Sequence, residues 1–354
     1  MKDIRSIEGQ IAIAFWKRCI IVALIAALFI PNTSANTRWW QLFFTRWGHG
    51  SGSDVFTNPE DGLVLLIGGA RQYIHGAFYD LSAPRVVRAM IDARRRGVEV
   101  SIVMEASNAR RRRAIIERLE DKGISIVRDT GRGLMHNKFM IIDGECLWTG
   151  SYNPTENDAV KNNNNAICIR SGELCEIYEK EFQEMFTERI FGNRREPGPF
   201  ALLRTKYHVK IDDTDINVYF SPEDNVERII MKRLSKARVS IHFMAFSFTS
   251  DPIGEMMIRK HREGIEVRGL FERRGSRSRH SEYLKMKAEG LPVKLDRNRH
   301  AMHHKVIIID GERVITGSYN FSRNASRHND ENIIIIDNRA IADAYLKEFN
   351  RLYR

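Results

Sequence analysis

Hydrophobic residues along this chain alternate between strand-like runs and helix-like spacing, and the same order of elements occurs twice. An apolar run that begins at Tyr73 predicts a strand, the segment from Pro84 to Arg96 predicts a helix, and Val98 to Met104 predicts a second strand. A shift of 167 residues reproduces this order from Ser240 onward, with Ile265 to Phe271 as the second strand. Strands that alternate with helices of this length predict an α/β fold in each half, with a largely parallel or mixed sheet.

Two stretches agree best under this shift, and they read MHNKFMIIDGECLWTGSYN (Met135 to Asn153) and MHHKVIIIDGERVITGSYN (Met302 to Asn320). They are identical at 13 of 19 positions. In each stretch an Asp-Gly pair, Asp143-Gly144 or Asp310-Gly311, separates two apolar runs, as expected for the turn of a β-hairpin. Each half is therefore predicted to contain a hairpin whose first strand carries a His-x-Lys triplet and whose second strand ends in Gly-Ser-Tyr-Asn.

Polar side chains recur at the same places in both hairpins. Because residues two apart on a strand point to the same side, the histidine and lysine of the first strand should project together, as should the serine and asparagine that end the second. The tyrosines between serine and asparagine, Tyr152 and Tyr319, should then point into the core. The residues in question are His136, Lys138, Ser151 and Asn153 in the first copy, and His303, Lys305, Ser318 and Asn320 in the second.

Two facing halves would bring both sets of groups around one pocket. Two lysines and two amides suit an anion with several oxygens, such as a phosphate, and two histidines supply a nucleophile and a general acid near neutral pH. A lone buried histidine is usually structural, but a lysine within an apolar strand is costly unless it is paired, which favours a functional site. The lysines supply the positive charge, so neither a metal ion nor a cofactor is expected. Asp143 and Asp310 are grouped with the site as turn or orienting residues rather than as acids or bases.

The pattern His-x-Lys, four residues, Asp, then Gly-Ser-x-Asn resembles the HKD motif of the phospholipase D superfamily, and with its flanks the resemblance extends from about Asp54 to the C-terminus. It implies two repeated α/β/α domains related by a pseudo-twofold axis, with the active site at their interface. It also implies a phosphodiesterase in which His136 attacks phosphorus to form a phosphohistidine while His303 protonates the leaving oxygen. The residues implied to hold the phosphoryl oxygens are Lys138, Lys305, Asn153 and Asn320, supported by Ser151 and Ser318.

Members of this superfamily often carry an acidic residue beyond the second strand that hydrogen-bonds to an active-site histidine. Glu331, in the sequence NDEN, fits this role, whereas the equivalent position of the first half is Asn164, which carries no charge. A carboxylate raises the pKa of the imidazole beside it and fixes its tautomer. The halves are therefore expected to be chemically unequal, and the sequence leaves open which histidine Glu331 serves.

Changes in composition predict the domain boundaries. The segment 191–214 replaces periodic apolar residues with glycine, proline and charge, which predicts a linker between a first domain at 54–190 and a second at 215–354. Residues 1–35 contain basic residues, a short apolar run and small residues in that order, which predicts a secretory signal or a membrane anchor. The chain is therefore expected to be exported to the cell envelope, the periplasm or the exterior.

Residues 36–53 form an aromatic segment between these regions. Trp40, Phe43, Phe44 and Trp47 fall at helical spacing. This spacing predicts an amphipathic helix, which would lie either in the membrane interface or on the protein's own core.

The chain of 354 residues is 43% hydrophobic and 29% charged, a globular composition, and its net charge is +11. A basic excess rich in arginine suits a nucleic acid, an anionic lipid surface or a phosphorylated substrate. Two arginine-rich segments follow equivalent predicted strands, so they should rim the site and line both sides of a groove for a sugar-phosphate backbone. The alternatives are solvated helix starts or attraction to lipid head groups. The arginines concerned are Arg110, Arg111, Arg112 and Arg113 in the first half, and Arg277 and Arg279 in the second.

Three functions remain after these considerations. The first is a nuclease on DNA or RNA, and the second is a phospholipase D or phosphatidyltransferase acting on phospholipid head groups at the membrane. The third is a catalytically silent nucleic-acid-binding protein, which the intact histidine and lysine positions disfavour. Both sets of catalytic residues lie on one chain, so a monomer is expected to be sufficient for activity.

Overall fold

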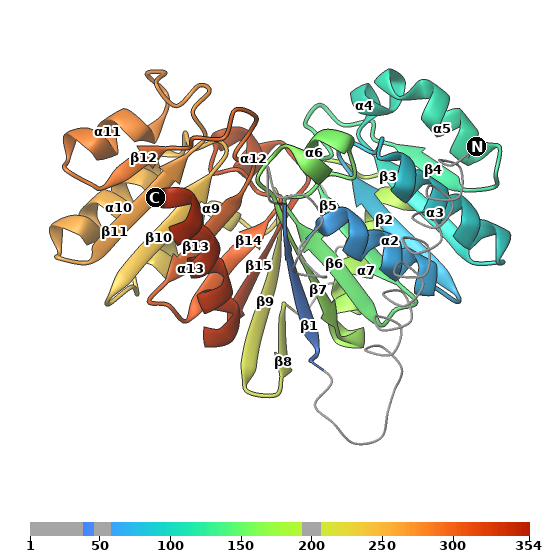
Figure 1. Ribbon diagram of the computed structural model, residues 1–354, viewed down its shortest axis with the longest axis horizontal. Helices are drawn as coiled ribbons and strands as arrows, with labels where there is room; N and C mark the ends of the chain where they lie inside the picture. The colour runs from blue at the N-terminus through green and yellow to red at the C-terminus, as the bar shows by residue number, and fades with distance from the viewer. Residues whose placement is uncertain (1–37, 46–57, 193–206) are drawn as a thin grey trace, which may run out of the picture.

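The computed structural model describes residues 38–45, 58–192 and 207–354 (Figure 1). The predicted signal or anchor at 1–35 lies outside these residues, as does Trp47 of the aromatic segment. Within the described ranges, no helix combines the length and apolar character that crossing a membrane requires.

The first half is built on a seven-stranded mixed sheet of order β1-β7-β6-β5-β2-β3-β4. Strands β2, β3 and β4 run parallel to one another, and the remaining neighbours are antiparallel. The strands are β1 (Trp40–Phe44), β2 (Tyr73–Phe78), β3 (Glu99–Met104), β4 (Ser125–Arg128), β5 (Lys138–Ile142), β6 (Cys146–Gly150) and β7 (Asn165–Arg170), and the helices are α2 (Pro59–Gly69), α3 (Pro84–Arg95), α4 (Ala106–Arg111), α5 (Arg113–Glu120), α6 (Glu156–Val160) and α7 (Gly172–Phe186).

The second half repeats this plan with an eight-stranded sheet of order β12-β11-β10-β13-β14-β15-β9-β8. Its parallel strands are β10, β11 and β12, which correspond to β2, β3 and β4. The strands are β8 (His208–Ile211), β9 (Thr214–Ser221), β10 (Ser240–Ala245), β11 (Glu266–Phe271), β12 (Val293–Leu295), β13 (Lys305–Ile309), β14 (Arg313–Gly317) and β15 (Glu331–Asp337), and the helices are α9 (Val226–Leu234), α10 (Asp251–Arg262), α11 (Glu282–Ala288), α12 (Arg323–Arg327) and α13 (Arg339–Tyr353). The predicted duplicated α/β fold is confirmed.

Local sequence explains where the helices that flank the parallel strands begin and end. Helix α3 starts at Pro84, whose fixed φ suits the first helical position, and the chain leaves it through Gly97 at a φ of 93°. The equivalent helix α10 is capped by Ser250, whose side chain accepts a hydrogen bond from the backbone N–H of Ile253. Gly97 thus returns the chain to the sheet at the start of β3, and Ser250 begins the helix that follows the end of β10.

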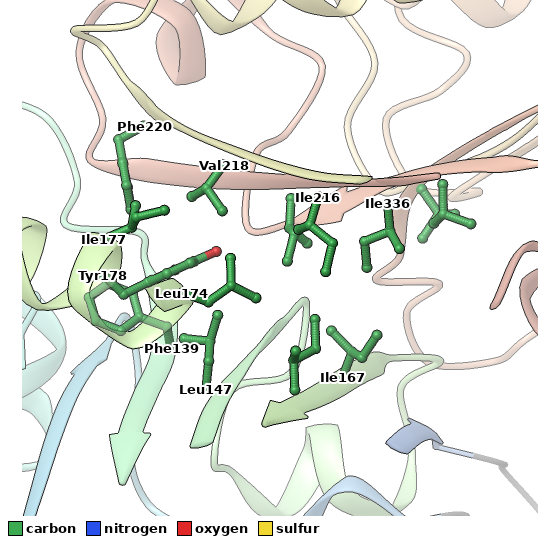
Figure 2. Close-up of a cluster of buried hydrophobic side chains, with 14 of the residues drawn as sticks. Phe139, Leu147, Ile167, Leu174, Ile177, Tyr178, Ile216, Val218, Phe220 and Ile336 are labelled. Carbon is green, nitrogen blue, oxygen red and sulfur yellow. The ribbon is translucent and has the colours of Figure 1, made fainter. Parts of the chain in front are cut away.

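A single hydrophobic cluster joins the two halves, and Figure 2 shows its centre. Side chains of β5, β6, β7 and α7 from the first half face side chains of β9 and β15 from the second, and the rings of Tyr178 and Phe220 pack edge to face with centroids 5.1 Å apart. Each fully buried side chain of this size contributes about 1.5–3 kcal/mol of hydrophobic stabilisation. The cluster is large, so the halves form one body and hold a shared site in a fixed geometry. The labelled members are Phe139, Leu147, Ile167, Leu174, Ile177, Tyr178, Ile216, Val218, Phe220 and Ile336.

The predicted amphipathic helix in the aromatic segment is wrong for Trp40–Phe44, which forms strand β1 and pairs antiparallel with β7. Alternate side chains enter opposite cores, with Phe43 on Trp148 (ring centroids 5.0 Å apart) and Phe44 on Tyr345 (5.4 Å). Both faces of this edge strand are covered, so its apolar residues lose the simple alternation that would have marked a strand.

The predicted linker at 191–214 also needs correction. Strand β8 and the first residue of β9 lie within it and belong to the second sheet. The second half therefore begins by His208, before the predicted boundary at 215. The polar alternation of an exposed edge strand resembled linker composition in this segment.

Candidate active site

Each motif histidine is held in place by the opposite half of the molecule. The backbone N–H of His136 donates to the carbonyl oxygen of Asp330 at 2.9 Å, and the N–H of His303 donates to the carbonyl oxygen of Asn163 at 2.8 Å. The segments before β5 and β13 thus form short parallel bridges with the segments that follow α12 and α6. This exchange brings the two motifs together at the boundary between the halves.

The histidines lie just before the strands and not on them, which modifies the predicted His-x-Lys geometry. Strand β5 begins at Lys138 and β13 at Lys305. The Nζ of Lys138 donates to the carbonyl oxygen of His136 at 2.6 Å, and the Nζ of Lys305 donates to that of His303 at 2.8 Å. Each lysine therefore fixes the turn that carries its own histidine.

Glu331 serves His136, across the boundary between the halves. The Nδ1 of His136 lies 2.7 Å from Oε2 of Glu331, and the hydroxyl of Ser318 donates to the same oxygen at 2.7 Å. Burial lowers the pKa of His136 to about 4 against the attraction of Glu331. Burial opposes ionisation of Glu331, but its interactions with His136 and Lys138 outweigh burial and lower the pKa of the carboxyl. A neutral imidazole that donates from Nδ1 to a carboxylate keeps the lone pair of Nε2 for nucleophilic attack.

The equivalent partner of His303 is neutral. Its Nδ1 lies 2.8 Å from Oδ1 of Asn164, which also accepts from the hydroxyl of Ser151 at 3.0 Å. Burial and the charge of Lys305 lower the pKa of His303 well below its usual value. The predicted inequality of the two halves is thus a direct difference in what each imidazole contacts.

A second carboxylate, Asp158, lies on the His303 side and was not predicted. Its Oδ2 is 3.8 Å from Nδ1 of His303 and accepts from both the backbone N–H and the side-chain amide of Asn153, at 2.9 and 2.8 Å. The equivalent residue in the second half is Ala325. Each half therefore contributes one carboxylate from a different position. The signal was visible in the sequence, since aligning the repeats places Asp158 opposite an alanine.

Both lysine ammonium groups are fully enclosed. Lys138 lies over the ring of Tyr79 at 5.1 Å and Lys305 over the ring of Phe246 at 4.7 Å, measured from Nζ to the ring centroid. Burial lowers the pKa of Lys138 to about 7 and that of Lys305 well below its usual value, against the attraction of Glu331. An anion bound between the lysines would raise both pKa values, so the site is poised to gain charge with its ligand.

The asparagines and serines of the two Gly-Ser-x-Asn segments have different surroundings. The side chain of Asn320 makes no hydrogen bond to any described residue, so its amide is free to donate to a ligand, whereas one N–H of Asn153 is taken by Asp158. Ser151 and Ser318 are fully buried and bond to Asn164 and Glu331. The serine hydroxyls therefore orient the partners of the histidines, and their predicted support of phosphate binding stays a prediction.

Asp143 and Asp310 do not belong to the site. The carboxylate of Asp143 accepts three backbone N–H groups at the start of β2, from Arg71, Gln72 and Tyr73, at 2.7–3.0 Å. Asp310 does the same at the start of β10. Strands β5 and β13 begin at the lysines, and the two aspartates come after the opposite ends of these strands. Asp143 and Asp310 are therefore turn residues, and grouping them with the catalytic residues is wrong.

The two arginine segments are unequal. Arg111 and Arg112 are ion-paired with Asp80 at 2.9 and 3.1 Å, and Arg113 is paired with Glu117 at 2.6 Å. Arg110 is exposed and is not ion-paired with any described carboxylate, and the same is true of Arg277 and Arg279. The predicted groove with two equivalent basic walls is therefore reduced on the side of the first half.

Comparisons with known proteins agree with this geometry. A family model described as "Cardiolipin synthase, PLD-like domain" matches residues 63–186 and again 230–353. A phospholipase D from Rickettsia prowazekii (strain Madrid E) is 30% identical over 140 residues, which make up 40% of this chain and 68% of that protein. A mitochondrial cardiolipin hydrolase from Xenopus tropicalis is 32% identical over 121 residues, which make up 34% of this chain and 58% of that protein. The crystal structure of phosphatidylserine synthase from Haemophilus influenzae Rd KW20 aligns with a TM-score of 0.61 at 11% identity and 83% coverage of each chain, which is a likeness of fold.

Proposed function

This chain belongs to the phospholipase D-like family and is a phosphoric diester hydrolase, and on that premise we propose that it is a nuclease that cleaves DNA or RNA through a phosphohistidine. The reaction needs no metal ion in this proposal, because Lys138, Lys305 and Asn320 supply the groups that would bind the phosphoryl oxygens. The feature that carries the choice of substrate is the set of exposed arginines after β3 and β11, Arg110, Arg277 and Arg279, which are not ion-paired with any described carboxylate.

In the first step, Nε2 of His136 attacks phosphorus, a P–N bond forms, and the P–O bond to the leaving group breaks. His303 gives its proton to the departing oxygen. In the second step, His303 takes a proton from water, the hydroxide attacks phosphorus, and the P–N bond breaks to release His136. The low pKa of His303 means that it must gain its proton in the complex, where the negative charge of the bound diester favours the imidazolium.

The nucleophile is assigned to His136 because of Glu331. Attack on phosphorus turns the imidazole into a cation, and a carboxylate bonded to Nδ1 stabilises that charge. The neutral oxygen of Asn164 gives His303 no comparable stabilisation. His303 is therefore assigned as the general acid and base.

The surface of the described residues supports a nucleic acid over a bilayer. Apolar side chains that enter the head-group region strengthen binding to a bilayer. Across the described ranges, the large hydrophobic side chains that are exposed are Leu134, Val160, Val239 and Leu284. Of these, Leu134 and Val160 are close in sequence to site residues. Exposed arginines occur in the sequence both before and after His303.

Hydrolysis or exchange of phospholipid head groups is the second candidate. It is favoured by the printed names of the relatives, a phospholipase D and a cardiolipin hydrolase. In this alternative the arginines face anionic head groups, and Leu134 and Val160 contact the bilayer surface.

One experiment separates these functions. Purified protein spanning residues 36–354 is incubated in EDTA with single-stranded DNA, duplex DNA, RNA and phosphatidylcholine liposomes, beside a His136→Ala control. Cleavage of nucleic acid that depends on His136 supports the nuclease, and choline release with intact nucleic acid supports the lipid enzyme. Binding of DNA without cleavage of any substrate would leave the silent binding protein.

We also propose that one chain is a complete catalytic unit, because both histidines and both lysines come from it. Activity should follow the monomer peak in size-exclusion chromatography. Activity confined to a dimer peak would refute this.

A further inference from the structure

Because the chain is an internal repeat, the charged residues that flank the site can be compared between its two halves. In the first half, Asp80 follows β2 and forms ion pairs with Arg111 and Arg112. The equivalent residue after β10 is Ser247, which carries no charge. The acidic group that neutralises the first arginine segment is therefore missing from the second.

The second half carries a set of arginines that we call the second-half rim. Arg277, Arg297 and Arg299 are exposed and are not ion-paired with any carboxylate in the part of the chain that the structure describes. Arg273 and Arg274 donate to the carbonyl oxygens of Asn298 and Arg299, at 2.9 and 3.1 Å, and such neutral acceptors do not cancel their charge. Two acidic residues of the same segments, Glu272 and Asp296, are buried and accept hydrogen bonds from backbone N–H groups. The rim consists of Arg273, Arg274, Arg277, Arg279, Arg297 and Arg299.

The rim is connected to His303 through the segment that leads into the site. Arg299 lies four residues before His303, a reach of at most about 14 Å. Glu272 accepts the backbone N–H of Met302, which ties the arginine segment to the residues that enter the site. The side chain of Asn298 donates to the carbonyl oxygen of Lys161 at 2.8 Å, so the same segment is fixed to the first half.

The geometry of in-line displacement indicates which part of the substrate the rim contacts. The attacking nitrogen and the leaving oxygen lie on opposite sides of phosphorus, and the leaving oxygen must be within reach of the general acid. With His136 as nucleophile and His303 as acid, the leaving portion of the substrate departs over the second half. In the first half, exposed Arg110 and Arg132 occupy the positions of Arg277 and Arg299, but Arg273, Arg274 and Arg297 have no arginine counterpart. We propose that the second-half rim binds the phosphates of the strand that is released, while the strand retained on His136 is held by the first half with fewer arginines. This proposal rests on the nuclease function and on the roles of the two histidines given above.

The test compares two substrates that differ in which side is a polyanion. The first is a single-stranded oligonucleotide cleaved at an internal diester, so its leaving portion is a strand. The second is an oligonucleotide that carries a terminal p-nitrophenyl phosphodiester, prepared at either end, so its leaving portion is p-nitrophenol. For the double variant Arg277→Ala/Arg299→Ala we expect KM for the first substrate to rise roughly 5- to 30-fold with little change in kcat, and KM for the second to stay within about twofold. The slope of log KM against log salt should fall by about 1.4 for the first substrate, for two lost phosphate contacts.

The matched control is Arg88→Ala/Arg118→Ala, which removes the same charge from α3 and α5. These exposed arginines line a hollow of about 320 Å³ on the outer helices and are not ion-paired with any carboxylate of the described chain. The control should keep the wild-type KM and salt slope on both substrates. An equal rise in KM in the control, or a rise for the p-nitrophenyl oligonucleotide in the rim variant, would overturn the proposal.

Failure of this proposal is distinguishable from failure of the nuclease function. Wild-type protein that hydrolyses bis(p-nitrophenyl) phosphate but no nucleic acid refutes the nuclease, and the rim proposal with it. Wild-type protein that cleaves the oligonucleotide, together with a rim variant of unchanged KM and slope, refutes the rim alone.

Discussion

Replacing Glu331 by glutamine tests the asymmetry of the two histidines most directly. The side chain is fully buried and its Oε2 lies 2.7 Å from Nδ1 of His136. Glu331→Gln keeps the shape and one acceptor but removes the charge that stabilises the imidazole once it is bonded to phosphorus. A hydrogen bond to a charged group contributes about 1.5–3 kcal/mol. If that contribution is made in the transition state, kcat/KM should fall roughly 10- to 150-fold.

The pH profile gives a second readout of the same change. Burial holds the pKa of His136 at about 4, so the neutral, nucleophilic imidazole predominates above that pH. Because Glu331 raises this pKa, its loss should move the acidic limb of the kcat/KM profile to lower pH. Hydrolysis of bis(p-nitrophenyl) phosphate between pH 3.5 and 8 measures both effects, and circular dichroism checks that the variant is folded over this range.

The repeat supplies the matched variant, Asn164→Asp. It places a carboxylate at the equivalent position, beside His303. The pKa of His303 should rise, and the limb of the profile set by the general acid should move to higher pH, without the loss seen in Glu331→Gln. Wild-type activity and an unmoved profile in Glu331→Gln would refute the assignment of His136 as the nucleophile supported by Glu331.

Three further substitutions separate catalysis from stability. Lys305→Met should lower kcat/KM by roughly 10²–10³, because it removes a cation from the phosphoryl oxygens. The urea midpoint should stay unchanged or rise, because an apolar side chain replaces a buried ammonium. A lowered midpoint would contradict this. Gly133→Ala would bring a Cβ to 1.7 Å from a backbone oxygen of the opposite half and should lower the free energy of unfolding by about 1–3 kcal/mol. In the control Gly68→Ala the added Cβ meets nothing within 4 Å, so this variant should not be destabilised. Equal melting temperatures of the two variants would count against the tight contact between the halves. Asp310→Ala should cost about 1–3 kcal/mol of stability, because backbone N–H groups lose their acceptor, while kcat of the folded protein stays near wild type; a large loss of kcat would return this carboxylate to the catalytic residues.

Local patterns in the sequence were sufficient for the parts of the molecule that depend on neighbouring residues. The hairpins, the helix that starts at Pro84 and the duplicated order of strands all follow from periodicity and turn residues within short stretches. The histidines and lysines could be singled out because polar groups in apolar strands recur at one spacing.

The remaining features depend on contacts between distant segments. Glu331 and His136 are 195 residues apart and meet through the packing of the halves, so no local pattern indicates which histidine Glu331 serves. Arg111 and Arg112 read as a free basic run because Asp80 is on another loop. The apolar residues of strand β1 show helical spacing because its two faces enter different cores.

The crossed backbone bridges of His136 and His303 have a consequence for how the two sides of the site are encoded. Each histidine is placed by a segment of the other half, so neither half can hold its own histidine without its counterpart. If two identical subunits made this site, every substitution would appear on both sides at once. Here one chain specifies each side separately, so position 164 is asparagine where 331 is glutamate, and position 158 is aspartate where 325 is alanine. Covalent linkage of the halves thereby allows two geometrically similar imidazoles to acquire different chemical environments one residue at a time.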